Sequence, residues 1–500
     1  MGIAGACLAV GLSWWAGAIA LALAWPERRP GRWAFVLGYG YIAGMIATGL
    51  LLRMQAALTG SLNPLVPTVV LGAGSAAATF LAWRSSRGPR VGGAGPVGVS
   101  HPHVSPLAAR VLVAALLAWL ALRFGTWLIE VSHRGIYPWD AWTTWAYRAR
   151  AWIQAGELAA FVSPEAWLAA PTGTAYAAAA SQYPLTPSYM VAWPVLAYGS
   201  WNEPAANLPW LGLALALGLT MYGQARLWGA SALSALVGVW LLGSLPILGS
   251  HVALAGYFDL WMAATLGCAF VSFLRWSRWR ETRDAVVAAA MAAACLLLKN
   301  EGTVWVLFFL PAVLALWVTW RGWLTVVVIA AVGLALLGVT GGFGFDWPGG
   351  GRVAISLDRL DLPRIGVIEF GVEPGVLGAV AVHLFVFDSW HLAVYAFLGT
   401  LVLYASTSLW GQAWRSEGAW HRAGLAWVLS AVAGFLVLFF LTGASEWARR
   451  GTSVNRILLQ FAPALLFWSL TVWWTVLESM GRGAAASGAT GGDSHSAQSA

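Results

Sequence analysis

The feature that most constrains this chain is a series of apolar stretches long enough, or nearly so, to cross a lipid bilayer. A helix that spans the hydrocarbon core needs about 20 mostly apolar residues. Of the 500 residues, 59% are hydrophobic and 10% are charged, against roughly 25% charged in soluble domains. The chain is therefore predicted to be an all-α, polytopic integral membrane protein with about 13 transmembrane helices. These lie at residues 3–25, 33–52, 64–83, 111–128, 208–221, 230–248, 253–274, 285–298, 303–320, 324–343, 392–410, 423–441 and 457–476.

The apolar stretches also suggest a division into regions. Residues 1–84 are predicted to be N-terminal transmembrane helices, the first of them retained because no basic segment precedes it. Residues 85–110 read as a Gly/Pro-rich cytoplasmic linker, 111–478 as a second transmembrane region, and 479–500 as a disordered Gly/Ala/Ser-rich tail. Two more apolar stretches, 185–198 and 365–387, are interrupted by proline or glycine and are predicted to be re-entrant or interfacial.

Arginine-rich loops indicate the orientation of the chain, because cytoplasmic loops carry an excess of basic residues. The same loops account for the net charge of +8, so we expect no nucleic-acid partner. Alternating sides from these loops places the segment 131–206 outside the cytoplasm, provided that 185–198 does not cross fully. The predicted cytoplasmic arginines are Arg28, Arg29, Arg32, Arg84, Arg87, Arg90, Arg110, Arg275, Arg278, Arg280, Arg283, Arg415 and Arg422.

Residues 135–152 (GIYPWDAWTTWAYRARAW) are too polar to span a membrane and combine an acid with two arginines and four tryptophans. As a helix from Asp140 onward, they would place tryptophans on one side and polar groups on the other. This pattern predicts an interfacial helix in the first large external loop, 131–206. Asp140 then serves as an N-cap, as the working acid of an active site, or as both. The predicted apolar side is Trp142, Trp145, Ala149 and Trp152, and the polar side is Asp140, Thr144, Tyr147, Arg148 and Ala151.

Several basic residues fall on the predicted outer side, against the usual charge asymmetry of membrane proteins. An anionic ligand such as a lipid phosphate would favour them there. The alternative is that short outer loops simply tolerate a few cations. The residues concerned are Arg148, Arg150, Lys299, Arg449, Arg450 and Arg456.

Three shorter motifs carry further candidates. The sequence QYPLTP at 182–187 leads into an apolar stretch, and GYFDL at 256–260 puts Asp259 just inside a predicted span, where an acid faces protein or a cavity. KNEG at 299–302 joins two spans. Asp388 and His391 have the spacing of a metal-ligand pair but lack a third ligand. No P-loop, GxGxxG, HExxH or GxSxG motif occurs in a credible context.

The order of these motifs resembles that of the polytopic GT-C glycosyltransferases, particularly bacterial enzymes similar to protein O-mannosyltransferases and lipid A aminoarabinose transferases. The resemblance covers roughly residues 111–476. The family's first-loop acid corresponds to Asp140, and its outer-helix lysine to Lys299. The family's H/K-P-P-L pattern corresponds to Tyr183 and the two residues after it, although this chain has Gln182 and Tyr183 where the family has His or Lys followed by proline.

The resemblance implies a multi-pass enzyme of the bacterial cytoplasmic (inner) membrane with its active site facing the periplasm or exterior. It would move a sugar from a polyprenyl-phosphate donor to a hydroxyl of a glycan, lipid or protein acceptor, with Asp140 as general base. No cofactor is required by this chemistry, and the metal dependence is left open between none and a divalent ion. The donor phosphate would bind Lys299, Arg449, Arg450, Arg456 and Arg148. Substrate contacts are expected from Trp139, Trp142, Tyr147, Tyr183, Tyr257, Asp259 and Glu301.

Two other classes of function stay open at this stage. A lipid-linked polysaccharide polymerase or ligase would share the helices and the external arginines. A secondary transporter would use Asp259 and Lys299 as coupling groups within the membrane, but would leave the tryptophan-rich helix and its acid unexplained.

Overall fold

The computed structural model describes residues 2–27, 29–85, 105–169, 175–346, 351–363, 366–410, 414 and 417–491. The chain is mostly helical (76%) with few strands, as the apolar sequence predicts. Nine helices in the described residues are long and apolar enough to cross a membrane, or ten if the bent pair α9 and α10 forms one span. Most of the predicted linker, the last nine residues, and Arg28, Arg87, Arg90 and Arg415 lie outside the described residues.

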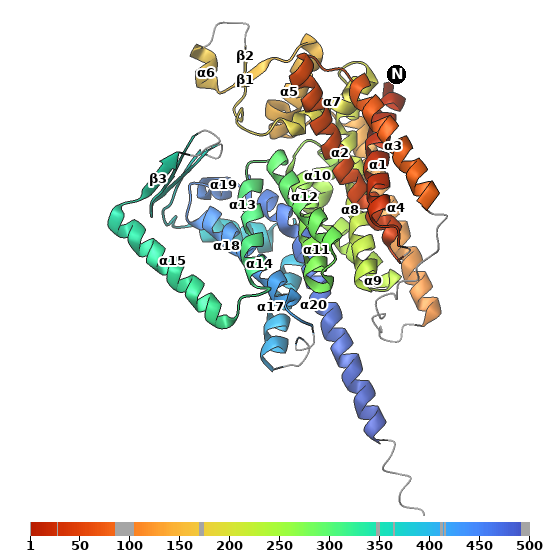
Figure 1. Ribbon diagram of the computed structural model, residues 1–500, viewed down its shortest axis with the longest axis vertical. Helices are drawn as coiled ribbons and strands as arrows, with labels where there is room; N and C mark the ends of the chain where they lie inside the picture. Colours follow the sequence, from red (N-terminus) through yellow and green to blue (C-terminus); the bar gives the residue numbers. More distant parts are fainter. Residues whose placement is uncertain are drawn as a thin grey trace, which may run out of the picture.

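The N-terminal part consists of four long helices (Figure 1). The first two cross at backbone contact: a Cβ atom on Gly17 would lie 2.0 Å from the carbonyl oxygen of Gly40. Small residues let two membrane helices approach to backbone contact and so maximise their van der Waals packing. The helices are α1 (Gly2–Ala24), α2 (Arg32–Thr59), α3 (Leu65–Ser85) and α4 (Pro106–His133).

The segment predicted to be external folds into short elements at the top of the molecule in Figure 1. Its two strands pair in parallel, with Ala160 opposite Ala175. The last helix, α7, has 13 residues and is about 20 Å long, which is too short to cross a bilayer. The elements are η1 (Ala141–Trp145), α5 (Ala146–Ala155), β1 (Ala160–Val162), α6 (Pro164–Ala169), β2 (Ala175–Ala177) and α7 (Thr186–Tyr198).

The centre of the molecule is built around α11, whose apolar residues are almost all buried. It packs against α12, α20, α8, α18, α10 and α2. Before it, α9 and α10 meet at a bend of 67°, where Pro246 begins the second helix. The central helices are α8 (Glu203–Trp228), α9 (Ala232–Ser244), α10 (Pro246–Ala253), α11 (Asp259–Trp279), α12 (Thr282–Leu298), α13 (Gly302–Leu307) and α14 (Phe309–Leu314).

The C-terminal part begins with α15, which stands away from the helical body together with a small sheet (Figure 1). The sheet is antiparallel in the order β3-β4-β5-β6. The elements are α15 (Trp320–Thr340), β3 (Phe343–Asp346), β4 (Arg352–Ile355), β5 (Arg359–Leu362), β6 (Gly366–Glu369), α16 (Val376–Ala381), η2 (Val382–Val386), α17 (Ala393–Trp410), α18 (Trp420–Phe440), α19 (Ser445–Arg449) and α20 (Val454–Gly491).

Several sequence predictions differ from this fold. The run 303–320 is divided into the short helices α13 and α14, and α12 has 17 residues, so neither counts as a full span. The run 365–387 begins with strand β6 rather than with a membrane segment, because short alternating stretches around it pair into the sheet. The predicted tail is helical as far as Gly491, where it continues α20.

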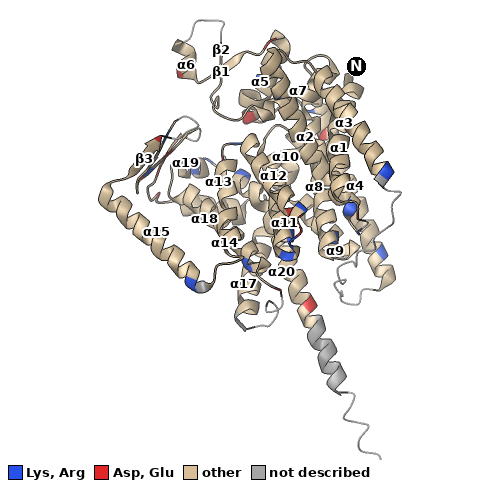
Figure 2. Ribbon diagram, viewed as in Figure 1, with Lys and Arg blue, Asp and Glu red and all other residues tan. Residues whose placement is uncertain are grey.

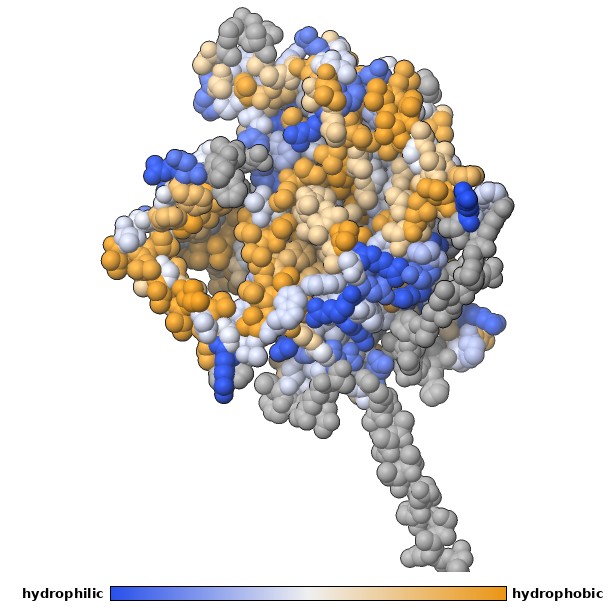
Figure 3. All heavy atoms as spheres, viewed as in Figure 1, coloured by the Kyte–Doolittle hydropathy of each residue, from blue (hydrophilic) through white to orange (hydrophobic). Residues whose placement is uncertain are grey.

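Basic residues gather at one end of the helical body (Figure 2). Around the turn between α11 and α12, Arg29 pairs with Glu281, and Arg283 pairs with Glu27 and Glu281. A hydrophilic band crosses this end of the visible face, below a largely apolar surface (Figure 3). The first residue of α11, Asp259, lies at the other end of this 21-residue helix, about 30 Å away.

Candidate functional site

The ends of several helices meet in a buried network of charged side chains centred on Asp259. The Asp259 carboxylate accepts hydrogen bonds from Lys299 Nζ at 2.8 Å and from Arg456 Nε and Nη2 at 2.9 and 2.8 Å. Gln460 Nε2 donates to the same carboxylate at 2.7 Å. Asp259 thus has four charge-assisted or amide donors, which compensate for removing its charge from water.

The network continues outward from these two cations. Arg456 Nη2 also binds Asp140 Oδ2, and Lys299 Nζ lies 3.1 Å from Glu301 Oε1. The Tyr183 hydroxyl donates to Glu301 at 3.2 Å. Burial and the nearby Glu301 charge raise the pKa of Tyr183. Three carboxylates therefore surround two cations.

Local sequence explains why these groups face one another. Asp259 is the first residue of α11, where a helix N-terminus favours an acid. Lys299 directly follows α12, where a helix C-terminus favours a cation. Gly256 has a φ of +126°, and a Cβ atom there would lie 2.5 Å from the Cβ of Ala141. Only glycine fits this turn, which brings the start of α11 against the residue after Asp140.

The network has a buried interior and an accessible rim. The Asp259 and Lys299 side chains are 1% and 5% exposed, whereas Asp140 is 31% exposed. The Arg456 guanidinium lies over the Tyr257 ring at 4.2 Å, so it is held between an aromatic face and two acids. Asp140 is consequently the acid of this network most open to an external reactant.

The helix after Asp140 differs from the predicted interfacial helix. It starts with a π-helical turn, Ala141–Trp145, before α5 continues as an ordinary α-helix. The wider π turn changes the register, so Trp145, Trp152 and Arg148 are all buried in protein. Thr144, which like Arg148 belongs to the predicted polar side, is buried as well. The prediction of an interfacial helix whose polar side faces water is therefore wrong for these two residues, whereas tryptophans packed against protein agree with it. Asp140 makes no side-chain capping hydrogen bond; its carboxylate binds Arg456 instead.

Arg148 occupies a different place from the one predicted for a phosphate ligand. Its guanidinium donates to the backbone carbonyls of Tyr183, Ala180 and Ser181 at 3.2, 2.8 and 2.9 Å. Burial lowers the pKa of Arg148 to about 10. With its donors directed at three carbonyls, Arg148 ties α5 to the segment that leads into α7.

The predicted sugar-stacking aromatics divide into two groups. Trp139 and Trp142 are exposed and contact each other edge to face, with ring centroids 4.6 Å apart. They flank Asp140 in the sequence. Tyr147 instead packs against Phe161 of strand β1, with ring centroids 5.4 Å apart.

Two of the predicted outer cations lie in a separate cluster. Arg449 pairs with Glu373 at 2.9 Å and with Glu446 at 3.5 Å, and Arg450 pairs with Glu446 at 2.8 Å. This cluster joins α19 to the segment after β6. The structure therefore brings Asp140, Lys299 and Arg456 together but leaves Arg449 and Arg450 with other acids.

A metal site is not formed by the residues suggested for one. His391 Nδ1 lies 2.8 Å from Asp388 Oδ1, but this pair has no third ligand. Across the described part of the chain, no group of three His, Cys, Asp or Glu side chains could hold a metal ion.

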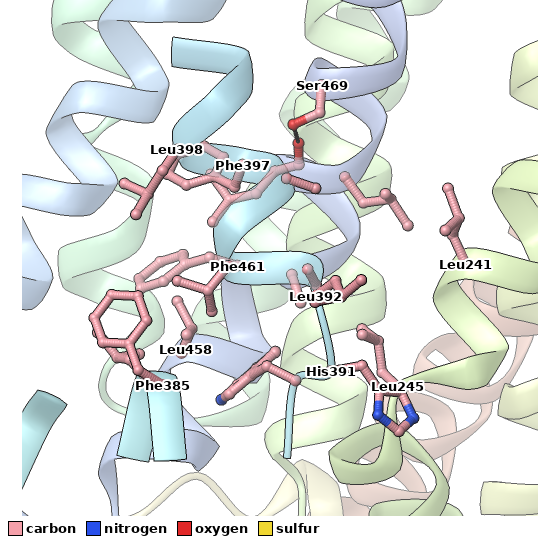
Figure 4. Close-up of a pocket in the computed structure, with 18 of the residues that line it drawn as sticks. Leu241, Leu245, Phe385, His391, Leu392, Phe397, Leu398, Leu458, Phe461 and Ser469 are labelled. Carbon is pink, nitrogen blue, oxygen red and sulfur yellow. Dashed lines mark hydrogen bonds between the residues drawn. The ribbon is translucent and has the colours of Figure 1, made fainter. Parts of the chain in front are cut away.

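A large apolar cavity lies on the other side of α20 from the network, and none of Asp140, Asp259, Lys299, Arg456 and Gln460 lines it. Its volume is about 970 Å³, and its walls come from α4, α9, α16, α17, α18 and α20. Leu458, Phe461 and Ser469 line it along α20, and Leu458 and Ser469 lie on the face of this helix opposite Arg456. Figure 4 shows Phe385, Leu458 and Phe461 on one side of the cavity and Leu241 and Leu245 on the other.

The sequence reasoning overlooked two polar residues near this site. Gln460 is fully buried and links Asp259 to Trp305, whose Nε1 donates to Gln460 Oε1 at 2.6 Å. Its position four residues after Arg456, inside an apolar run, was a readable signal of a shared helix face. Arg123 lines the cavity and interrupts the predicted span 111–128, which is the usual sign of a functional membrane residue.

No protein-family model, curated protein or solved structure matches this chain. The assignment of a function therefore depends on the residues of this chain and on their geometry.

Proposed function

We propose that this chain is a membrane glycosyltransferase that moves a sugar from a polyprenyl-phosphate donor to an acceptor hydroxyl on the extracytoplasmic side. The observation that carries the proposal is the position of Asp140. It is a partly exposed carboxylate held by Arg456 at the edge of a buried charge network, and the helix that carries Arg456 also lines, with its other face, a cavity whose residues are almost wholly apolar. This arrangement suits a reaction between a water-accessible hydroxyl and a lipid-borne donor.

Asp140 acts as the general base in this proposal. The acceptor oxygen forms a bond to the anomeric carbon while the bond from that carbon to the donor phosphate oxygen breaks. The hydroxyl proton passes to the Asp140 carboxylate, and the polyprenyl phosphate leaves with the electron pair. Because phosphate is a good leaving group, one carboxylate suffices, and the acid–base pair of a glycosidase is not required.

The other network residues hold Asp140 and the donor in place. Arg456 orients Asp140 and offers its remaining guanidinium surface to the departing phosphate. Lys299 and Asp259 are buried too deeply to meet a substrate directly, so they position Arg456. Trp139 and Trp142, two exposed rings that contact each other next to Asp140 in the sequence, are available to stack on sugar rings. Arg148, Arg449 and Arg450 are left out of the phosphate contacts because Arg148 binds backbone carbonyls and the other two pair with Glu373 and Glu446, apart from Asp140.

The proposal is tested with Asp140→Asn, assayed in membranes supplied with a polyprenyl-phosphate-linked sugar. The variant should lose about 10²–10⁴-fold of the transfer rate while keeping wild-type protein levels. Asp388→Asn, a change in an exposed acid outside the network, is the matched control. Unchanged transfer by Asp140→Asn would remove the assignment of the base.

One observation favours a secondary transporter as a second candidate. α9 and α10 form a span bent by 67°, and broken spans beside buried charges are typical of transporter binding sites. Proton- or ion-driven solute uptake into proteoliposomes would support this function. If that uptake required Asp259 but not Asp140, the protein would be a transporter rather than a glycosyltransferase.

A further inference from the structure

Arg123 is a cation within the membrane-spanning helix α4, and it has no acidic partner among the residues that the structure describes. It lies ten residues before the outer end of α4. Its Nε is buried without a hydrogen-bond acceptor among the described residues, and no ion pair formed within that part of the chain includes it. Its contact with the Trp127 ring, at 5.1 Å, is a modest compensation. An ionised side chain at this depth is costly unless something pairs with it.

The guanidinium is held at the bend between α9 and α10. A Cβ atom on Gly249 would lie 2.1 Å from Arg123 Nη2, so glycine makes room for the guanidinium against α10. On the neighbouring wall, His391 has a φ of +48°, and its ring lies near Leu245 at the start of α10 (Figure 4). Arg123 and His391 thus supply the two basic side chains of the cavity wall.

The rest of the cavity offers Arg123 no counter-charge. Apart from Arg123 and His391, its lining is aliphatic and aromatic, with two serines. In contrast, Arg456 and Lys299 are compensated by three carboxylates. Among the described residues of the network and the cavity wall, Arg123 is thus the arginine without an acidic partner, and it faces a space that fits hydrocarbon.

We propose that this cavity binds the chain of a long-chain lipid phosphate whose phosphate group contacts Arg123. The apolar walls receive the hydrocarbon chain, and the guanidinium forms charge-assisted hydrogen bonds with the phosphate oxygens. The proposed function places the donor phosphate at Arg456, so a lipid phosphate held at Arg123 is the spent carrier after it has left the reaction site. That identity rests on the proposed function; the binding itself does not.

The affinities for farnesyl phosphate and for farnesol, which has the same chain but no charge, are measured on the purified full-length protein in nanodiscs. Trp119, Trp240 and Trp390 line the cavity and supply a fluorescence signal. The wild type should bind farnesyl phosphate about tenfold or more tightly than farnesol. Arg123→Gln should abolish this preference and Arg123→Lys should retain part of it. Arg110→Gln, an exposed arginine on the same helix, should leave it unchanged.

A second variant tests the cavity without touching the arginine. Ala396 lines the cavity from an exposed position on α17, so Ala396→Trp should fit and should weaken binding of both probes. The proposal would be overturned if Arg123→Gln kept the wild-type preference for farnesyl phosphate, or if the wild type bound farnesol and farnesyl phosphate equally tightly. Displacement of farnesyl phosphate by an equal amount of phosphatidylglycerol would also overturn it.

The outcome is separable from the proposed function. Asp140→Asn should bind farnesyl phosphate like the wild type, because Asp140 is not part of the cavity. If Asp140→Asn also retains transfer while Arg123→Gln loses the phosphate preference, the proposed base is wrong and the lipid-phosphate site stands.

Discussion

The same substitution at the two acids that bind Arg456 should differ in its effect on stability: Asp259→Asn should destabilise the protein, and Asp140→Asn should abolish activity with little loss of stability. Asp259→Asn removes a charge that is 1% exposed and has donors from Lys299, Arg456 and Gln460 at 2.7–2.9 Å. Two cations then lose their shared carboxylate inside the protein. Removing one partner of a buried ion pair costs about 3–5 kcal/mol.

We expect the lower end of that range, about 3 kcal/mol, for a structural reason. After Asp259→Asn, Arg456 still binds Asp140, and Lys299 still binds Glu301. Asp140 is 31% exposed and has one ionic partner, so Asp140→Asn should cost about 1 kcal/mol or less. The expected difference between the two variants is therefore about 2 kcal/mol.

Unfolding in mixed micelles of dodecyl maltoside and increasing SDS, followed by tryptophan fluorescence, measures this difference. Transfer from a polyprenyl-phosphate sugar is measured on the same preparations. Asp140→Asn should be nearly as stable as the wild type but inactive, whereas Asp259→Asn should be destabilised. Asp388→Asn, at a side chain that is 81% exposed, should change stability by less than about 0.5 kcal/mol.

Equal destabilisation by Asp140→Asn and Asp259→Asn would refute the distinction between a buried interior and an accessible rim. A double-mutant cycle gives an independent check. Asp259→Asn and Lys299→Met should be coupled by about 0.5–3 kcal/mol, because they remove two ends of one contact. Strict additivity would show that this contact is not formed.

Three further results are expected. Arg148→Met should destabilise the protein by about 2–3 kcal/mol and speed proteolysis of the segment 131–206, because three backbone carbonyls lose a charged donor; unchanged proteolysis would contradict this role. Gly256→Ala should lower the thermal stability and the transfer rate together, since the new Cβ meets Ala141 and a φ of +126° disfavours alanine; a wild-type unfolding curve would argue against the close approach. A cysteine replacing the exposed Glu157 should react with a membrane-impermeant maleimide on intact cells and one replacing Arg110 should not; the reverse labelling would invert the topology.

The sequence predicted the mostly helical, multi-pass class of fold because partitioning into a bilayer depends on local composition. A run of apolar residues carries that information without any knowledge of its neighbours. The helix count was less predictable. The run 303–320 is apolar enough but breaks at Phe308, and the strands after α15 pair with one another through contacts that no single stretch encodes.

The candidate site shows the same division. Asp140, Asp259, Lys299 and Arg456 could each be selected from the sequence, because charged residues at the ends of apolar runs need a reason to be there. Their possible roles in catalysis stay predictions. The sequence could not separate Arg456 from Arg449, because the two lie in one short basic segment and only helix packing decides which acid each meets.

Asp140 and the residues after it mark the boundary most clearly. Sequence alone determined that an acid, arginines and tryptophans lie next to a membrane span, since this follows from composition. Only the tertiary structure decided that the first turn is π-helical and that Arg148 donates to backbone carbonyls. The tertiary structure also decided that Asp140 binds Arg456, which is 316 residues later in the chain. The reason is physical: burial of a charge is determined by the partners that long-range packing brings to it.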